Sequence, residues 1–232
     1  MNAPVPPSPT SPSRPAPVDV RDMIAAHQGM RREFRLTAAS VRRTPDGDAR
    51  QARRVSAHVR CLTTLLDHHH AGEDRLLWPK LTARTPQALT ATIAGMERQH
   101  ETIHGLLQAV DAQTTAWAAR PDSPARLELA DSLSRLTDAL EEHLDAEEAA
   151  VLPLASAHLS LAEWQELEED GLKEMPKRDL AFVSGMIMYH ADPACVAVLV
   201  ARAPAPVRVF ASLAGPRSYA RRARRVHGTA TP

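Results

Sequence analysis

Histidine and glutamate residues interrupt the apolar stripes of several predicted helices, and their side chains can bind metal ions or transfer protons. In the segment "LLDHHHAGEDRLLWPKL", residues 65–81, three consecutive histidines and Glu73 stand among leucines. The apolar stripe passes through Leu66, His69, Glu73 and Leu76 at steps of four and three, so His69 and Glu73 take inward-facing positions. Buried imidazole and carboxylate groups are costly unless they pair with something.

The same interruption recurs 74 residues later. The segment "LDHHHAGEDRLLWP" aligns without gaps with "LEEHLDAEEAAVLP", and a shift of 73 aligns "MIAAHQGM" with "MERQHETI". These alignments pair His69 with His143, Glu73 with Glu147 and His27 with His100, and His104 follows one helical turn after His100. The candidate metal ligands are therefore His27, His69, Glu73, His100, His104, His143 and Glu147.

Other polar residues near these positions are expected to have lesser roles. His68 and His70 align with Glu142 and Leu144, so the repeat predicts that they flank the ligands without binding metal. Asp74 and Glu148 are predicted to face solvent, although Glu148 replaces Glu147 as a ligand if that helix is rotated slightly. A structural role is expected for His58, and three histidines lie outside the pattern, namely His158, His190 and His227.

Four long helical patterns carry the candidate ligands, over about residues 18–43, 48–84, 85–119 and 123–157. Short turns between long helices predict an all-α, up-down-up-down four-helix bundle covering residues 18–158. Thr85 and Ser123, each followed by proline, are predicted N-caps.

The segments on either side of the bundle are less regular. Residues 1–17 are rich in proline and serine and are expected to form a disordered leader. The capping box "SLAE" at 160–163 begins an extension of short helices over 159–226, and 227–232 form a tail. Breaks in this extension are expected at Pro176, Pro193, Pro204, Pro206 and Pro216.

Composition restricts the classes of partner. The chain has zero formal net charge and only 3% aromatic residues, so a nucleic-acid partner is not expected, and the basic stretch "RRARR" at 221–225 is read as a solvated helix end. No apolar run has the length of a membrane span, and no secretion signal is apparent. The two cysteines form no C-x-x-C motif, and a reduced, cytoplasmic protein is expected.

The ligand set favours particular metals. Five imidazoles and two carboxylates without a thiolate suit iron or manganese better than a structural zinc ion. Seven protein ligands exceed what one ion needs and fit two ions, with the carboxylates able to bridge.

The motif set H27 … H69-x-x-x-E73 … H100-x-x-x-H104 … H143-x-x-x-E147 resembles the hemerythrin or HHE cation-binding domain. The resemblance implies a non-haem di-iron centre. His100, His104 and His143 would bind one iron, and His27 and His69 the other. Glu73 and Glu147 would bridge, together with an oxo or hydroxo group. The second iron is then one ligand short, which leaves an open position for dioxygen, hydrogen peroxide or nitric oxide.

The expected function is to bind or reduce dioxygen or peroxide, in sensing, detoxification or iron handling. Two alternatives remain: an oxidase or oxygenase that acts on an organic substrate beneath a lid formed by 159–226, and a non-catalytic iron or oxygen sensor that binds a partner protein. Arg31, His68 and His70 lie close enough to the ligands to assist proton transfer to bound peroxide. Peroxide breakdown is therefore expected in preference to reversible oxygen carriage.

Overall fold

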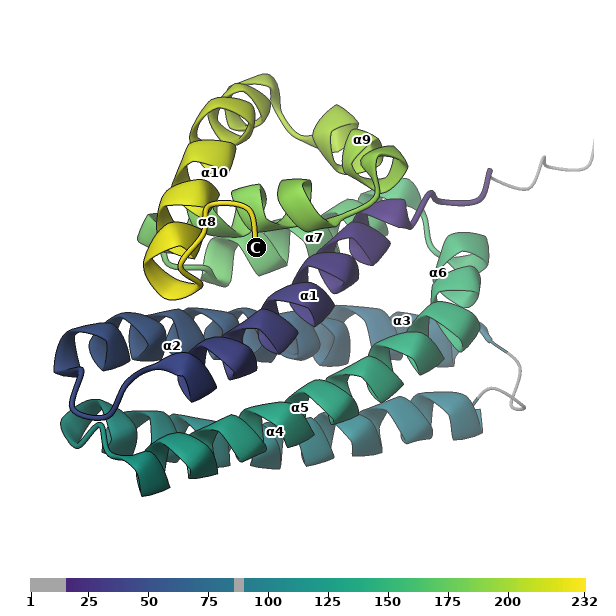
Figure 1. Ribbon diagram of the computed structural model, residues 1–232. Helices are drawn as coiled ribbons and strands as arrows, with labels where there is room; N and C mark the ends of the chain where they lie inside the picture. Colours follow the sequence, from purple (N-terminus) through teal and green to yellow (C-terminus); the bar gives the residue numbers. More distant parts are fainter. Residues whose placement is uncertain (1–15, 86–89) are drawn as a thin grey trace, which may run out of the picture.

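Four long helices form the body of the protein in a computed structural model that describes residues 16–85 and 90–232 (Figure 1). They are α1 (Arg21–Arg43), α2 (Ala49–Gly72), α4 (Thr90–Ala119) and α5 (Ser123–Ala150). The helix α2 continues through a π-helical segment, η1 (Glu73–Leu77), into α3 (Trp78–Arg84), and α5 is followed by α6 (Leu152–His158). Because α1 packs on α2 and α5, and α4 packs on the same two helices, the four form a closed bundle. The predicted all-α bundle is confirmed.

Two helix starts show how local sequence sets the helix boundaries. The Asp48 carboxylate accepts a hydrogen bond from the Gln51 backbone N–H at the start of α2. At the start of α5 the Asp122 carboxylate accepts from the Ala125 N–H, so the N-cap is Asp122, and the prediction of Ser123 was wrong by one residue. Thr85 ends α3 in an extended conformation. The predicted helix start at Pro86 lies outside the described residues.

The extension contains four helices: α7 (Leu161–Glu174), α8 (Lys177–His190), α9 (Pro193–Arg202) and α10 (Ala205–Val226). The capping box at Ser160 and Glu163 is confirmed, as are the breaks at Pro176, Pro193 and Pro204. The breaks expected at Pro206 and Pro216 are absent, because α10 runs through both. Pro206 lies in the first turn, where a proline removes no intrahelical hydrogen bond.

The crossing of α8 and α10 depends on two glycines. Gly185 of α8 lies directly against Gly215 of α10, and a Cβ atom at Gly185 would overlap the Gly215 carbonyl group. This close approach holds α10 on α8 immediately beside Pro216. The extension therefore includes one long, continuous helix as well as the short ones that were expected.

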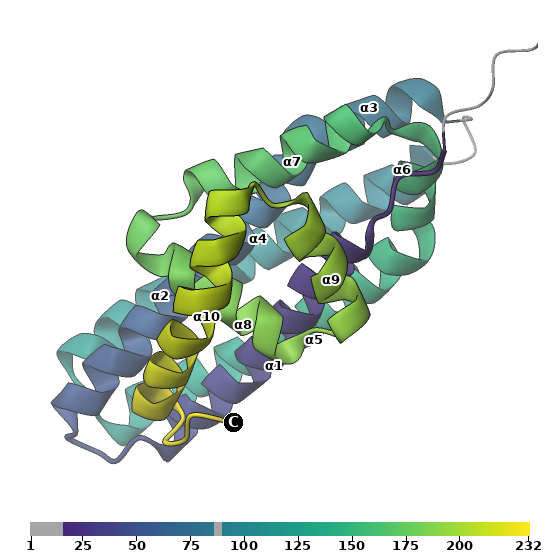
Figure 2. The same cartoon turned by 90° about the horizontal axis from the view of Figure 1, so that it is seen from above.

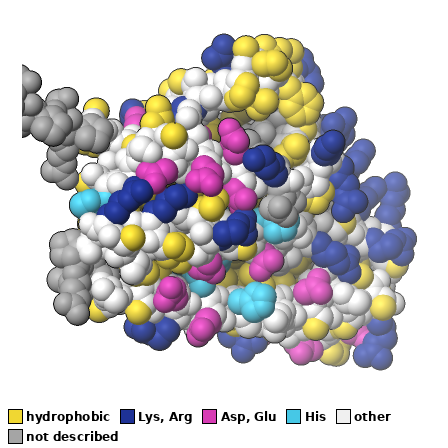
Figure 3. Space-filling view, turned by 180° about the vertical axis from the view of Figure 1, so that it is seen from behind, with side chains coloured by type: hydrophobic (Ala, Val, Ile, Leu, Met, Phe, Trp, Pro, Cys, Tyr) yellow, Lys and Arg dark blue, Asp and Glu magenta, His cyan; other side chains and the backbone are white. Residues whose placement is uncertain are grey.

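The extension covers one face of the bundle (Figure 2). Helices α8 and α9 pack on α1, α10 packs on α8 and α2, and α7 packs on α2 and η1. The first half of α10 exposes several large apolar side chains, and hydrophobic side chains gather at the top of the molecule in Figure 3. These exposed residues include Val207, Val209, Phe210 and Leu213. No described helix is both long and apolar enough to cross a membrane.

Two apolar clusters divide the core, and the candidate ligands lie between them. The larger cluster includes Met30 of α1 and Leu140 of α5, and the smaller one includes Val151 together with Trp164 of α7. Along α1, His27 follows residues packed on the smaller cluster and precedes Met30 of the larger one. A dry layer on each side therefore keeps water away from the polar groups.

Candidate metal centre

The structure brings seven histidine and glutamate side chains into two adjoining groups inside the bundle. Site A contains His27, His69, Glu73 and Glu147, and site B contains His70, Glu73, His100 and His143. Within each group, one potential ligand atom of every residue lies within 4.8 Å of the others. Six of the seven residues predicted as ligands are thus found together.

Site A joins α1, α2, η1 and α5. The His27 Nε2 atom lies 3.2 Å from His69 Nε2 and 3.5 Å from Glu147 Oε2, and His69 Nε2 lies 3.3 Å from Glu73 Oε1. The His69 side chain is 12% exposed, whereas the other three are fully buried. Among the four side chains of site A, only that of His69 reaches solvent.

Site B joins the end of α2 with η1, α4 and α5. The His100 Nε2 atom lies 3.2 Å from His143 Nε2 and 3.5 Å from Glu73 Oε2. The His70 ring stacks on the His100 ring with 4.1 Å between centroids. Three imidazoles thus gather at site B, compared with two at site A.

The two glutamates lie between the sites. Glu73 directs Oε1 toward His69 of site A and Oε2 toward His100 of site B. Glu147 directs Oε2 toward His27 of site A at 3.5 Å and toward His143 of site B at 3.8 Å. Each carboxylate can therefore bridge two ions. Glu73 also begins η1, and π-helical turns inside helices occur frequently at functional sites.

Several buried ligand atoms in this centre have no hydrogen-bond partner. They are both carboxylate oxygens of Glu73, both of Glu147, and Nε2 of His70. An unpaired buried polar group costs about 1–3 kcal/mol, and more when it carries charge. A set of such atoms that face one another fits a bound cation, which would pair with all of them at once.

Burial determines the protonation of these groups when no metal is bound. Burial, and then the neighbouring charge of Glu147, raise the pKa of Glu73 well above its usual value. Burial, and then charge on nearby histidines, lower the pKa of His70 and bring that of His143 to about 3. His70 and His143 are therefore neutral near pH 7, as metal ligands must be, and Glu73 would release its proton when a cation binds.

A second layer of side chains holds the outer nitrogens of the ligand rings. His27 Nδ1 lies 2.9 Å from Glu148 Oε1, His100 Nδ1 lies 2.7 Å from Asp74 Oδ1, and His143 Nδ1 lies 3.2 Å from Gln99 Oε1. A proton on each Nδ1 leaves the Nε2 lone pair directed into the centre. Asp74 is exposed as predicted and also orients His100, whereas Glu148 is only 26% exposed and orients His27. The 74-residue repeat extends to this pair. Glu147 faces the centre, while Glu148 lies outside it.

His104 does not join the centre, so its predicted position was wrong. Its side chain is 60% exposed and contacts Asp67 and Gln108. The buried stripe of α4 runs through Met96, His100, Ile103 and Leu107, and Ile103 takes the inward position after His100. The prediction placed the next inward residue four positions after His100, at His104, whereas the helix places it three positions after His100, at Ile103.

His70 enters the centre although the repeat predicts a bystander. Consecutive residues project about 100° apart around a helix. The end of α2 passes both sites, so His69 reaches site A while the next residue reaches site B. The three consecutive histidines at 68–70 were the sequence signal for a second ligand in this helix. The repeat alignment assumes that the helix has one inward direction, so it selects only one of the three.

Site B has one imidazole more than site A because position 70 differs from its repeat partner. The counterpart of His70 in α5 is Leu144, which is fully buried and apolar. The repeat therefore supplies two histidines to each site and adds the extra imidazole of His70 to site B alone. When both glutamates are counted at each site, site A has four protein ligands and site B has five.

Replacing His70 with glutamine is expected to reduce the metal content by about half, with the ion of site B lost first, because His70 is specific to that site. Replacing His104 with glutamine is the matched control and is expected to leave the metal content unchanged. Elemental analysis of both variants, purified in parallel, measures the difference. Loss of metal from the His104 variant alone would contradict the placement of both residues.

The comparisons with known proteins agree with this architecture. Residues 18–155 match the hemerythrin HHE cation-binding domain, and the chain belongs to this family. The resemblance identified from the motifs is therefore confirmed. The matched segment contains all seven residues of the two sites and ends before the extension.

Uncharacterized proteins of Mycobacterium tuberculosis and Mycobacterium bovis are also similar to this chain. They are 26% identical over 162 residues, which cover 69% of this chain and 62% of theirs. The match thus leaves more than a third of the length of these relatives uncovered. No solved structure gives a significant match.

Proposed function

We propose that the chain binds two iron ions, one at each site, with Glu73 and Glu147 bridging them. The observation that carries this proposal is the set of buried, unpaired ligand atoms on Glu73, Glu147 and His70. Five imidazoles and two carboxylates are donors typical of iron or manganese, and neither cysteine belongs to the group. His104, assigned to one iron by the resemblance, is replaced by His70 in this proposal.

We further propose that site A binds a small oxidant such as dioxygen, hydrogen peroxide or nitric oxide. Iron bound there would supply redox chemistry and a coordination position that no protein ligand fills. The side chains of site A are buried or nearly so, with His69 the most exposed at 12%. This burial favours a molecule of a few atoms over an organic substrate. A cavity of about 740 Å³ between α2, α8 and α10 has none of the site residues in its lining.

Arg31 acts on His27 through Glu148. One Arg31 Nη group donates to Glu148 Oε1 at 2.6 Å and the other donates to Asp145. Burial raises the pKa of Glu148, but hydrogen bonds from His27 and Arg31 outweigh it and lower the pKa overall. Arg31 therefore serves as a positioning residue that keeps an ionised carboxylate against His27. The contribution expected from Arg31 to peroxide breakdown comes through this contact.

Metal analysis together with optical spectroscopy tests the proposal. Protein produced with ample iron is expected to contain close to two irons per chain, and its near-ultraviolet absorption is expected to change when peroxide is added. Release of dioxygen from added peroxide would support breakdown. An oxygen adduct that forms and dissociates without consuming peroxide would instead indicate storage. Stoichiometric zinc with no iron uptake would contradict the iron assignment.

A further inference from the structure

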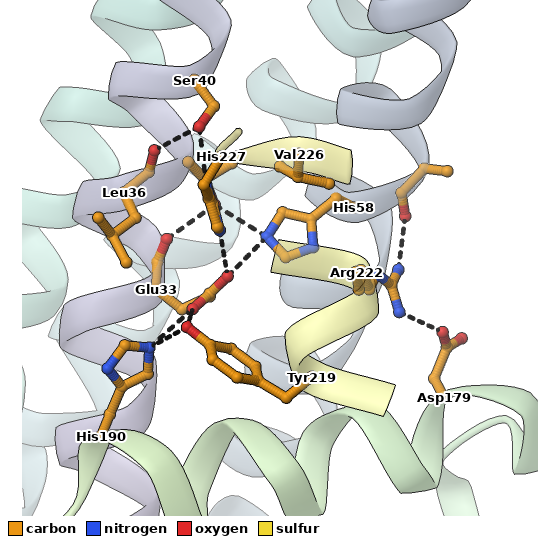
Figure 4. Close-up of polar contacts among 12 residues, drawn as sticks. Glu33, Leu36, Ser40, His58, Asp179, His190, Tyr219, Arg222, Val226 and His227 are labelled. Carbon is orange, nitrogen blue, oxygen red and sulfur yellow. Dashed lines mark hydrogen bonds and ion pairs between the residues drawn. The ribbon is translucent and has the colours of Figure 1, made fainter. Parts of the chain in front are cut away.

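A second cluster of histidines surrounds one buried carboxylate between the bundle and the extension (Figure 4). Glu33 Oε1 lies 3.0 Å from His58 Nε2 and 2.7 Å from His227 Nε2, and Glu33 Oε2 lies 3.0 Å from His190 Nε2. The four side chains are at most 4% exposed. Three imidazoles therefore direct the same ring nitrogen at a single carboxylate that has no access to water.

Four separate segments contribute to this cluster. Glu33 lies on α1, His58 on α2, His190 at the end of α8, and His227 directly after α10. His190 and His227 lie beyond the matched family segment, which ends at residue 155. Glu33 follows His27 by six residues, a rise of about 9 Å along a helix. The cluster is thus separate from sites A and B, and it exists only because the extension folds back onto the bundle.

The Ser40 hydroxyl group contacts the outer nitrogen of His227, whereas the hydroxyl groups of Thr37 and Tyr219 contact Nε2 of His58 and His190. Ser40 Oγ lies 2.7 Å from His227 Nδ1, and its own proton is directed to the Leu36 carbonyl at 2.9 Å. In that arrangement Ser40 accepts from His227 Nδ1, and His227 Nε2 faces the Glu33 carboxylate at 2.7 Å. Either a proton or a metal cation must lie between these two electron-rich atoms, and Ser40 orients His227 as the outer partner of a metal-bound histidine does.

We propose that Glu33, His58 and His227, with His190 as the fourth ligand, bind one divalent cation of the zinc type. Ligand atoms of Glu33, His58 and His227 lie within 4.8 Å of one another, which allows all three to reach an ion at about 2.0–2.2 Å. Imidazole nitrogen and carboxylate oxygen both bind zinc, and a closed, four-coordinate arrangement is the geometry of zinc ions that stabilise a fold. The ligand–ligand distances would widen from the present hydrogen-bond lengths to about 3.3 Å, the edge of a tetrahedron with such bonds.

This ion would stabilise the packing of the extension on the bundle. Two of its ligands come from α1 and α2 of the bundle, and two come from the ends of α8 and α10. Tyr219 of α10 joins the same cluster, with its hydroxyl group 2.7 Å from His190 Nε2. A cation at Glu33 therefore holds the last helix and the residue after it against the bundle.

Zinc titration followed by native mass spectrometry tests this proposal. Wild-type protein is expected to bind one zinc ion more than the His227→Gln variant, while the His158→Gln control keeps the wild-type count. The Glu73→Gln variant, altered in the other centre, is expected to retain the ion at Glu33. Its result separates failure of this proposal from failure of the two-iron proposal.

Anomalous scattering from zinc-soaked wild-type crystals supplies a measurement that needs no variant. A zinc peak among Glu33, His58 and His227 is the expected result. Equal zinc counts in the wild-type and His227→Gln proteins, or no peak at Glu33 in zinc-soaked crystals, would overturn the proposal. Either result would show that a proton occupies the place assigned here to the metal.

Discussion

Replacing Glu73 with glutamine is expected to remove both metal ions of the bundle centre. Glu73 directs one oxygen at each site, at 3.3 Å from His69 and 3.5 Å from His100. A neutral amide is a much weaker ligand and cannot bridge two cations as a carboxylate does. Elemental analysis of the purified variant measures the loss directly.

The fold of the Glu73→Gln variant is expected to survive without metal. Burial, and then the charge of Glu147, raise the pKa of Glu73 so far that the metal-free side chain is already uncharged, and glutamine has nearly the same shape. Stabilisation by bound metal, about 2.7 kcal/mol for each ion at a hundred times Kd, is then lost. The Tm in the presence of iron should fall by about 5–11 °C for each ion lost.

The exposed residue Glu142 provides a matched control for Glu73. The Glu142→Gln variant removes the same charge beside His143 without touching either site, and it should keep the wild-type metal content and Tm. Retention of both ions by the Glu73→Gln variant would refute the bridging assignment. A fall in Tm that is equally large without metal would show that Glu73 acts on the fold alone.

Replacing Leu144 with histidine is expected to fill the coordination position that we propose to be open at site A. Leu144 is the repeat counterpart of His70, which adds the third imidazole to site B. The internal repeat therefore directs a histidine at 144 toward site A. Metal content should stay at the wild-type value, whereas affinity for azide, a probe of open iron positions, should fall at least tenfold, or about 1.4 kcal/mol.

The Leu144→Met variant separates coordination from packing. Methionine has a similar volume, and such exchanges in a core cost less than about 1.5 kcal/mol. This variant should bind azide as the wild type does. Unchanged azide binding in a metal-loaded Leu144→His protein would show that the small ligand does not use site A.

The sequence by itself determined the bundle and most of its centre. The steps of three and four through His69 and Glu73, repeated at His143 and Glu147, identify buried polar positions because a helix has a fixed period. The same regularity led to the family and to six of the seven residues that the structure brings together. Capping residues such as Ser160 and Glu163 act within one turn and were equally predictable.

Only the tertiary structure decided which neighbouring residue faces the centre. His70 was predicted to be a bystander and His104 a ligand, and the structure places them the other way round. Helical periodicity alone does not reveal that α2 passes two sites while α4 turns Ile103 inward. The cluster at Glu33 was likewise inaccessible to sequence analysis. Its ligands are separated by up to 194 residues, and no local period links α1 to a histidine after α10. Contacts of this kind depend on how whole helices pack, because the direction of one side chain is set by elements distant in the sequence.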